Sequence, residues 1–200
     1  MRIQKWIGLA VAAVVIGACA QSGSSNTTQI SNVKKHQLLV KLCTQPMRFQ
    51  CVNQPFTVTL VKRNGSTYRH TFEPPIPVIQ KQDITVFAGQ ILNIEVTPGK
   101  DGQLKQLKLV EKVTHPDSTL VLKLEQESDK GMTLEVHNPF PRSLLYKAEI
   151  RPLGRKRFMA TDVCPVGPRL ENFESWLGPL IQVRLTDMHL VSLKGGVVTC

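Results

Sequence analysis

Local signatures of catalysis are missing from this 200-residue sequence. It contains neither a Gly-x-Ser-x-Gly nucleophile turn nor a Gly-x-x-x-x-Gly-Lys-Ser/Thr phosphate loop. No two of its five histidines lie two or four residues apart, and it has no Cys-x-x-Cys pair, so no metal site is indicated. The carboxylates are scattered, and none stands out as a glycosidase acid. We therefore expect a protein that is not an enzyme and needs no metal or cofactor.

A long hydrophobic run is also lacking. The apolar segment from Trp6 to Ile16 is too short for a transmembrane helix, which needs about 20 apolar residues. It follows Arg2 and Lys5 and precedes small residues, which is the three-part layout of a secretory signal. The sequence thus predicts export rather than membrane spanning, and export takes the chain away from cytoplasmic nucleic acid.

The residues Ile16-Gly17-Ala18-Cys19 end this segment with an apolar residue, two small ones and a cysteine. This pattern resembles the lipobox of bacterial lipoproteins. The resemblance implies that residues 1–18 are a signal peptide removed by cleavage, and that Cys19 is lipidated on its sulfur and acylated on its new amino group. Three acyl chains hold a protein to a membrane without spanning it. The alternative is an ordinary secreted protein in which Cys19 is incidental.

The resemblance also implies a location. Lipoproteins kept in the inner membrane commonly carry aspartate after the lipidated cysteine, and this chain has Ala20 there. We therefore expect the protein at the outer membrane, lipid-anchored and facing the periplasm.

Acidic residues are few. The chain has 15 Asp and Glu against 25 Lys and Arg, and without Arg2 and Lys5 the mature chain keeps an excess of eight positive charges. Such a balance favours anionic neighbours, which in an envelope are lipid phosphates, cell-wall polymers or acidic protein surfaces. The alternative is that the charge only keeps the domain soluble.

The cysteines fit an oxidising compartment. With Cys19 assigned to lipid, an even number remains, which in an exported chain predicts two disulfides. The remaining four are Cys43, Cys51, Cys164 and Cys200. Four cysteines permit three pairings, and the sequence alone does not choose between them. We favour Cys43 with Cys51, which are close in the chain, and Cys164 with Cys200, which would fasten the last residue.

The rest of the chain predicts an all-β fold. Residues 19–35 follow no apolar period and are expected to be the lipidated cysteine and a flexible tether. Residues 36–200 carry short runs of branched and aromatic residues between turn formers, which is typical of strands. The predicted strands are 37–43, 56–62, 84–87, 91–97, 104–113, 119–125, 132–137, 144–150, 157–163, 181–185 and 189–193.

These strands indicate an antiparallel β-sandwich, immunoglobulin-like or transthyretin-like, with at most one short helix. The spacing of Leu170, Phe173, Trp176 and Leu177 predicts that helix over 169–177. A sub-boundary near 98–102 is an alternative to one extended unit, which we favour.

Two clusters are candidates for binding. The first is cationic and surrounds the turn at 152–154; its members are Lys147, Arg151, Arg155, Lys156 and Arg157. On a hairpin these side chains could meet phosphate or carboxylate groups, or they could guard an exposed strand edge. The second is aromatic and joins the loop at 138–142 with Tyr146, Phe173 and Trp176, which could line a groove or belong to the core.

Three functions remain open. The leading hypothesis is a non-enzymatic outer-membrane lipoprotein that binds an envelope protein or an assembly such as a secretion or surface-appendage machine. The alternative is a module that binds an anionic glycan, lipopolysaccharide or a soluble ligand through the basic hairpin. A cell-wall hydrolase ranks last, because its catalytic groups would have to assemble from distant strands.

Overall fold

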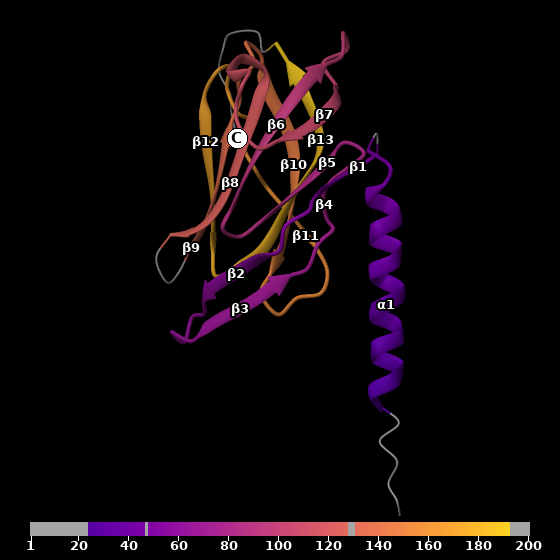
Figure 1. Cartoon of the computed structure of the whole chain (residues 1–200). Helices are drawn as coiled ribbons and strands as arrows, with labels where there is room; N and C mark the ends of the chain where they lie inside the picture. Colours follow the sequence, from indigo (N-terminus) through magenta and orange to yellow (C-terminus); the bar gives the residue numbers. More distant parts are fainter. Residues whose placement is uncertain (1–23, 47, 128–130, 193–200) are drawn as a thin grey trace, which may run out of the picture. The chain divides into compact units, whose positions relative to one another are not determined.

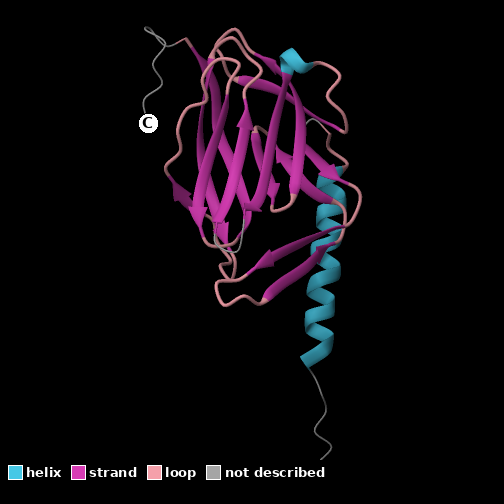
Figure 2. Ribbon diagram, turned by 90° about the vertical axis from the view of Figure 1, so that its left-hand side faces the viewer, coloured by secondary structure: helices cyan, strands magenta, loops and turns pink. Residues whose placement is uncertain are grey.

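Two antiparallel β-sheets face each other in the computed structural model, which describes residues 24–46, 48–127 and 131–192 (Figures 1 and 2). Six strands form the first sheet, in the order β1 (Phe49–Val52), β4 (Ile76–Gln80), β5 (Asp83–Phe87), β13 (Leu180–Val191), β10 (Ser143–Pro152) and β11 (Met159–Thr161). Five form the second, in the order β12 (Glu171–Leu177), β9 (Gly131–His137), β8 (Thr119–Glu127), β6 (Gln90–Pro98) and β7 (Leu104–Val110). The predicted all-β sandwich is confirmed.

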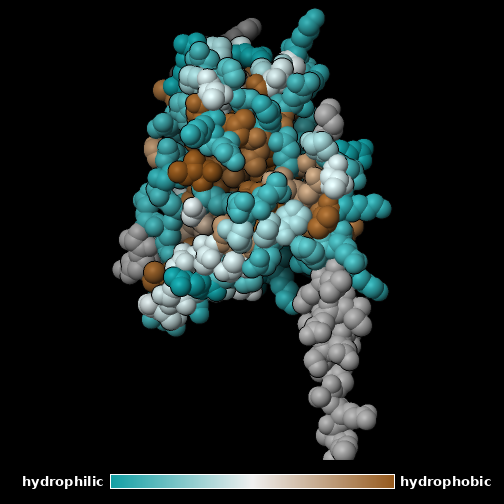
Figure 3. Space-filling view, viewed as in Figure 1, coloured by the Kyte–Doolittle hydropathy of each residue, from teal (hydrophilic) through white to brown (hydrophobic). Residues whose placement is uncertain are grey.

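The core lies between the sheets because the strands alternate in polarity. Leu92 and Ile94 of β6 are buried, whereas Asn93 between them faces outward. Val86 of β5 and Val183 of β13 are paired across the other sheet and are fully buried. Burial of such a side chain contributes about 1.5–3 kcal/mol relative to leaving it in water. On the face drawn in Figure 3, hydrophilic side chains surround a group of apolar ones near the middle.

A separate two-stranded hairpin closes one end of the sandwich. It consists of β2 (Phe56–Val61) and β3 (Thr67–Phe72), and it lies across the lower end of the sheets in Figures 1 and 2. The rings of Phe56 and Phe72 both pack edge-on against Phe87 of β5, with centroids 5.0 and 4.8 Å from it. We call this end of the sandwich, with the β10–β11 and β12–β13 turns, the hairpin end.

Two glutamine side chains connect strands that are not neighbours in a sheet. The amide of Gln50 on β1 donates to the carbonyl of Leu107 on β7 and accepts from the N–H of Leu109 at 2.6 Å. The amide of Gln126 on β8 bonds both backbone groups of Val61 on β2, at 2.7 and 2.9 Å. Each amide thus satisfies backbone groups that would otherwise need another strand or water.

The structure corrects the prediction at the start of the described chain. A helix, α1 (Ser24–Cys43), replaces both the expected flexible tether over 24–35 and the expected strand over 37–43. This segment contains no Gly or Pro, and its Leu and Lys residues are good helix formers. The short apolar run Leu38-Leu39-Val40 fits a strand and a helix equally well, which explains the error. None of the helices in the described ranges is long and apolar enough to cross a membrane.

A second correction concerns 169–177, where a helix was expected. Residues Glu171–Leu177 form β12, an edge strand paired with β9 along its whole length. Phe173 and Leu177 point to the exposed side of the strand and Trp176 to the half-buried side. Because apolar residues occupy both faces of this edge strand, they are spaced three and four residues apart, which is also the spacing of a helix.

Smaller differences affect other strands. β1, β3 and β4 were not predicted, and the two expected final strands form one, β13, which continues past Asp187 although that residue has φ of 53°. A short 3-10 helix spans Pro116–Ser118.

The chain divides into two compact units, one up to His36 and one from Gln37. The second contains every strand of the described ranges, and the division does not fall at 98–102, where β6 and β7 pair Pro98 with Leu104. Cys43 is bonded to Cys51, as predicted. Cys164 is also disulfide-bonded; Cys200, the partner expected for it, lies outside the described residues.

Candidate functional site

Three segments that are far apart in the sequence meet at the hairpin end. They are the end of β2 with Lys62 and Arg63, the β10–β11 turn, and the β12–β13 turn. The N–H of Leu153 in one turn donates to the carbonyl of Pro179 in the other at 2.9 Å, which fixes the two turns to each other. Together the three segments line an open hollow of about 680 Å³, which we call the basic hollow.

The floor of the basic hollow is apolar. Ile150, Trp176 and Leu180 line it and pack on the core of the sandwich. The indole N–H of Trp176 donates to the hydroxyl of Thr161 on β11 at 3.0 Å, so the ring spans the edges of the two sheets. A half-buried indole with its N–H already bonded presents its apolar face to a ligand.

The rim of the basic hollow is cationic. Lys62, Arg63 and Arg155 line it without any acidic residue. None of the three takes part in an ion pair with another described residue. The positive charge at the rim is therefore not neutralised by this part of the chain.

In the β12–β13 turn, Gly178 lies beside the guanidinium group of Arg63. Gly178 has φ of 94°, a conformation that side-chain-bearing residues rarely adopt. A Cβ at this position would stand 3.5 Å from Nε and Nη2 of Arg63, so the guanidinium group lies against the turn backbone. The positive φ of the turn is what favours glycine here, since a Cβ would meet Arg63 only in ordinary van der Waals contact.

The structure separates the five basic residues that the sequence grouped. Arg155 lines the basic hollow, and Lys156 and Arg157 are exposed on the adjoining turn. Lys147 instead binds Asp187 at 2.9 Å, and this ion pair raises the pKa of the lysine and lowers that of the aspartate. Arg155, Lys156 and Arg157 therefore remain together on the turn without an ion pair to another described residue.

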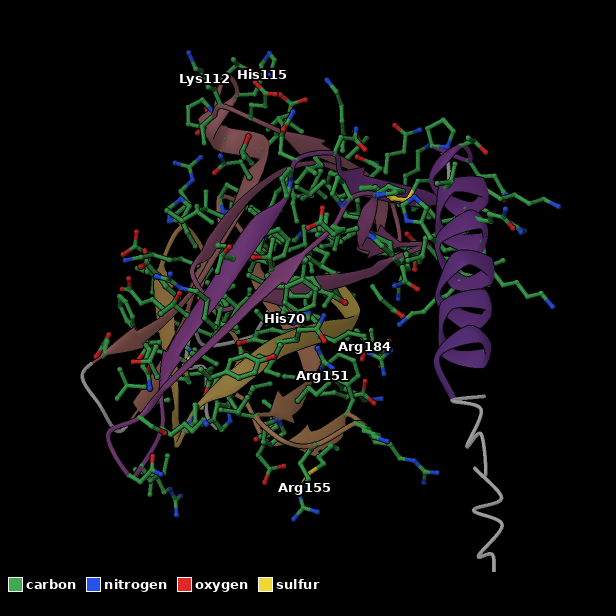
Figure 4. All side chains as sticks on the ribbon, turned by 60° about the horizontal axis from the view of Figure 1, so that its bottom comes forward. His70, Lys112, His115, Arg151, Arg155 and Arg184 are labelled. Carbon is green, nitrogen blue, oxygen red and sulfur yellow. A yellow bond between two sulfur atoms is a disulfide. The ribbon has the colours of Figure 1, made fainter. Side chains whose placement is uncertain are left out.

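Arg151 has a different environment. It is half-buried, and its Nε has no hydrogen-bond partner within the described ranges. Desolvation lowers its pKa, while nearby Tyr68 of the β2–β3 hairpin has the opposite influence. Its neighbours Ile150 and Pro152 line the basic hollow, so Arg151 points to the other side of β10. Figure 4 shows Arg151 and Arg155 at the hairpin end and Lys112 and His115 at the far end.

An ion pair and a stacking contact hold the base of the β10–β11 turn. Arg184 of β13 donates from both Nε and Nη2 to Glu149 of β10, with the Nε bond at 2.6 Å. The same guanidinium group lies 4.4 Å from the centroid of the Phe158 ring. Arg184 is thus engaged in fixing the turn that presents Arg155 to Arg157.

The predicted aromatic groove does not form, because its members lie in different places. Asn138 is fully buried, and its amide donates to the carbonyls of Arg142 and Gly167, both at 2.8 Å, and of Val166 at 3.2 Å. Tyr146 belongs to the core, and burial raises its pKa. Phe173 is exposed on the outer side of β12, away from Trp176.

Sequence reasoning missed part of the basic hollow. The Lys62-Arg63 pair stands directly before the Asn64-Gly65 turn, a local signal similar to the one that nominated Arg155. The apolar floor carries no local signal, because it forms only when β12 and β13 meet β10.

Other sites receive no support from the described residues. These residues contain no group of three His, Cys, Asp or Glu side chains that could hold a metal. A second hollow, of about 450 Å³, is lined by Arg48, Lys81, Lys105 and Lys108, but Lys105 is paired with Asp101 and Lys108 with Glu95. Cys19, the expected lipidation site, lies outside the described residues.

Fold and site together define an antiparallel β-sandwich with a cationic hollow at one end. Comparison with protein-family models, with curated proteins and with solved structures finds no match. The choice between an immunoglobulin-like and a transthyretin-like arrangement stays a prediction.

Proposed function

We propose that the protein is a non-enzymatic binding component of the bacterial cell envelope, anchored to the periplasmic side of the outer membrane by lipid on Cys19. The signal layout and the lipobox-like residues at 16–19 support the anchor. The Cys43–Cys51 bond suits an oxidising compartment such as the periplasm. The hairpin end provides the contact surface.

The observation that carries the proposal is that the cations around the basic hollow have no acidic partner among the described residues. Lys62, Arg63 and Arg155 surround an apolar floor, and neither the lining nor any ion pair within the described ranges supplies a counter-charge. Guanidinium groups bind phosphates and carboxylates through two parallel hydrogen bonds. An anionic partner could form these bonds without breaking an ion pair within the described chain. In the second hollow, by contrast, two of the lysines are already paired with acidic residues.

Two kinds of partner fit this surface. The leading one is an envelope protein with an acidic surface, in an assembly such as a secretion or surface-appendage machine. The other is an anionic glycan, lipopolysaccharide or soluble ligand. The apolar floor favours a partner that has apolar as well as anionic parts.

Crosslinking of the lipidated protein in intact cells tests the proposal. We expect a defined set of envelope products that is lost in the Cys19→Ser variant and in the double variant Arg63→Gln, Arg155→Gln. The matched control, Arg48→Gln with Lys112→Gln, removes the same charge from exposed residues outside the basic hollow and should keep the products. Unchanged products in the Arg63, Arg155 variant would refute the proposed contact surface. Absence of a lipid-modified Cys19 in mass spectrometry of the parent protein would refute the anchor.

A further inference from the structure

Leu177 is the most exposed large hydrophobic side chain among the described residues, with 87% of its surface accessible. It lines the basic hollow at the β12–β13 turn, directly before Gly178. An apolar side chain in this position contributes little to the folded core, because water surrounds it in the folded and the unfolded chain alike. Its exposure leaves it available for a contact with something outside the chain.

The neighbours of Leu177 indicate what that contact is. Lys62, Arg63 and Arg155 line the same hollow, and Lys156 and Arg157 are exposed on the adjacent turn. An exposed apolar side chain within a group of cations is the pattern of surfaces that bind the headgroup region of anionic membranes. The indole of Trp176 beside it is a side chain that favours the boundary between water and lipid.

We propose that the hairpin end docks on anionic phospholipid, with Leu177 entering the boundary between headgroups and acyl chains and the five cations contacting phosphates. This inference rests on the proposed function, because lipid on Cys19 keeps the domain at the membrane surface. Such tethering makes the second contact intramolecular, so a weak contact is sufficient. A protruding leucine also fits a soft bilayer, whereas a folded acidic protein would need a pocket shaped to receive it.

The chain carries its own probe for this contact. Its two tryptophans are Trp6 and Trp176, and cleavage before Cys19 removes the first. The fluorescence of the mature lipidated protein therefore reports on Trp176 alone, in the floor of the basic hollow. Phospholipids with brominated acyl chains quench tryptophan only at short range.

The experiment reconstitutes the mature lipidated protein into vesicles of phosphatidylcholine alone or of phosphatidylcholine with phosphatidylglycerol, each doped with brominated lipid. We expect quenching of Trp176 in the anionic vesicles that is reversed by high salt, and little quenching in the neutral ones. The anchor is present in both, so the difference isolates the second contact. Equal quenching in the two kinds of vesicle, or none in either, would overturn the inference.

Variants locate the contact. Each cation removed by Arg63→Gln or Arg155→Gln should weaken docking about fivefold, and Leu177→Asn should weaken it through lost apolar insertion. The charge control is Arg48→Gln with Lys112→Gln. The apolar control is Leu170→Asn, which removes a leucine that is 58% exposed just before the other end of β12. Equal loss in the controls would overturn the assignment to the hairpin end.

Failure of this inference differs from failure of the proposed function. If Trp176 is not quenched by anionic vesicles while the crosslinks in cells still depend on Arg63 and Arg155, the partner is an envelope protein or a glycan and the membrane contact is refuted. If the crosslinks also persist in the Arg63, Arg155 variant, the assignment of the basic hollow as the contact surface is refuted.

Discussion

Gln126 and Val61 exchange two hydrogen bonds, in which the side-chain amide of the glutamine bonds the N–H and the carbonyl of the valine. Val61 is the last residue of β2, and Lys62 and Arg63 follow it. Two of the cations at the rim of the basic hollow are therefore positioned by a side chain of the five-stranded sheet.

Replacement of Gln126 by alanine should destabilise the protein and loosen this rim. Both backbone groups of Val61 lose their partner, and each half-buried group left unsatisfied costs about 1–3 kcal/mol. Chemical denaturation measures the loss. The control Gln106→Ala removes an exposed glutamine and should change the free energy of unfolding by less than about 0.5 kcal/mol. Equal effects of the two variants would show that the amide of Gln126 is not structural.

Asn138→Ala should be more destabilising, by roughly 3 kcal/mol or more, because a fully buried amide that serves three carbonyls and the N–H of Phe140 is removed. Asn138→Asp tests the donors separately, since a carboxylate accepts from Phe140 but cannot donate to a carbonyl. Thermal unfolding compares the two. A melting temperature close to that of the parent in Asn138→Asp would contradict the role of the amide as a donor.

The carboxyl group of Glu95 should titrate at unusually low pH. Hydrogen bonds from His115 and then Lys108 and Thr114 lower its pKa to about 2. A carboxyl whose pKa is lower in the folded chain contributes stability above its unfolded pKa, near 4.5, and loses it as the pH falls towards 2. Carbon NMR of the side chain follows the titration. His115→Ala should move the pKa upward, and Lys62→Ala, at the hairpin end, should leave it in place.

Loss of the bond between Cys43 and Cys51 should cost about 2.5 kcal/mol, because the closed loop is short, with a sequence separation of 8. The double variant Cys43→Ser, Cys51→Ser and the parent are compared by denaturant unfolding under oxidising conditions. Cys164 remains bonded in both, so the comparison isolates one bridge. An unchanged midpoint would mean that the loop is already restricted in the unfolded chain.

The fold was predictable where a strand has one buried face. In β6 and β8 buried Leu and Ile alternate with Asn93 or Lys123, and this period of two identifies a strand without further information. Prediction failed where that condition does not hold. Leu38 to Val40 is too short a run to show a period, and β12 carries Phe173 and Trp176 on opposite faces.

The candidate site was predictable only in part. Arg155 to Arg157 are neighbours on a turn marked by Pro152 and Gly154, so sequence alone could group them. Lys62, Arg63 and the floor around Trp176 join them through packing of strands that are distant in the chain. Lys147 was grouped with them by sequence proximity, yet its partner Asp187 comes from β13.

The hydrogen bonds of Gln50 also bear on whether the second sheet can pair, edge to edge, with another molecule. Its amide occupies the carbonyl of Leu107 and the N–H of Leu109 on β7, an edge strand of the second sheet. An incoming strand of another molecule would need these same two groups to extend the sheet. The lipid anchor that we propose would concentrate chains in two dimensions, where extension of sheets from one molecule to the next is favoured. The side chain that joins the two sheets therefore also leaves fewer free backbone groups on this edge for a strand of another molecule.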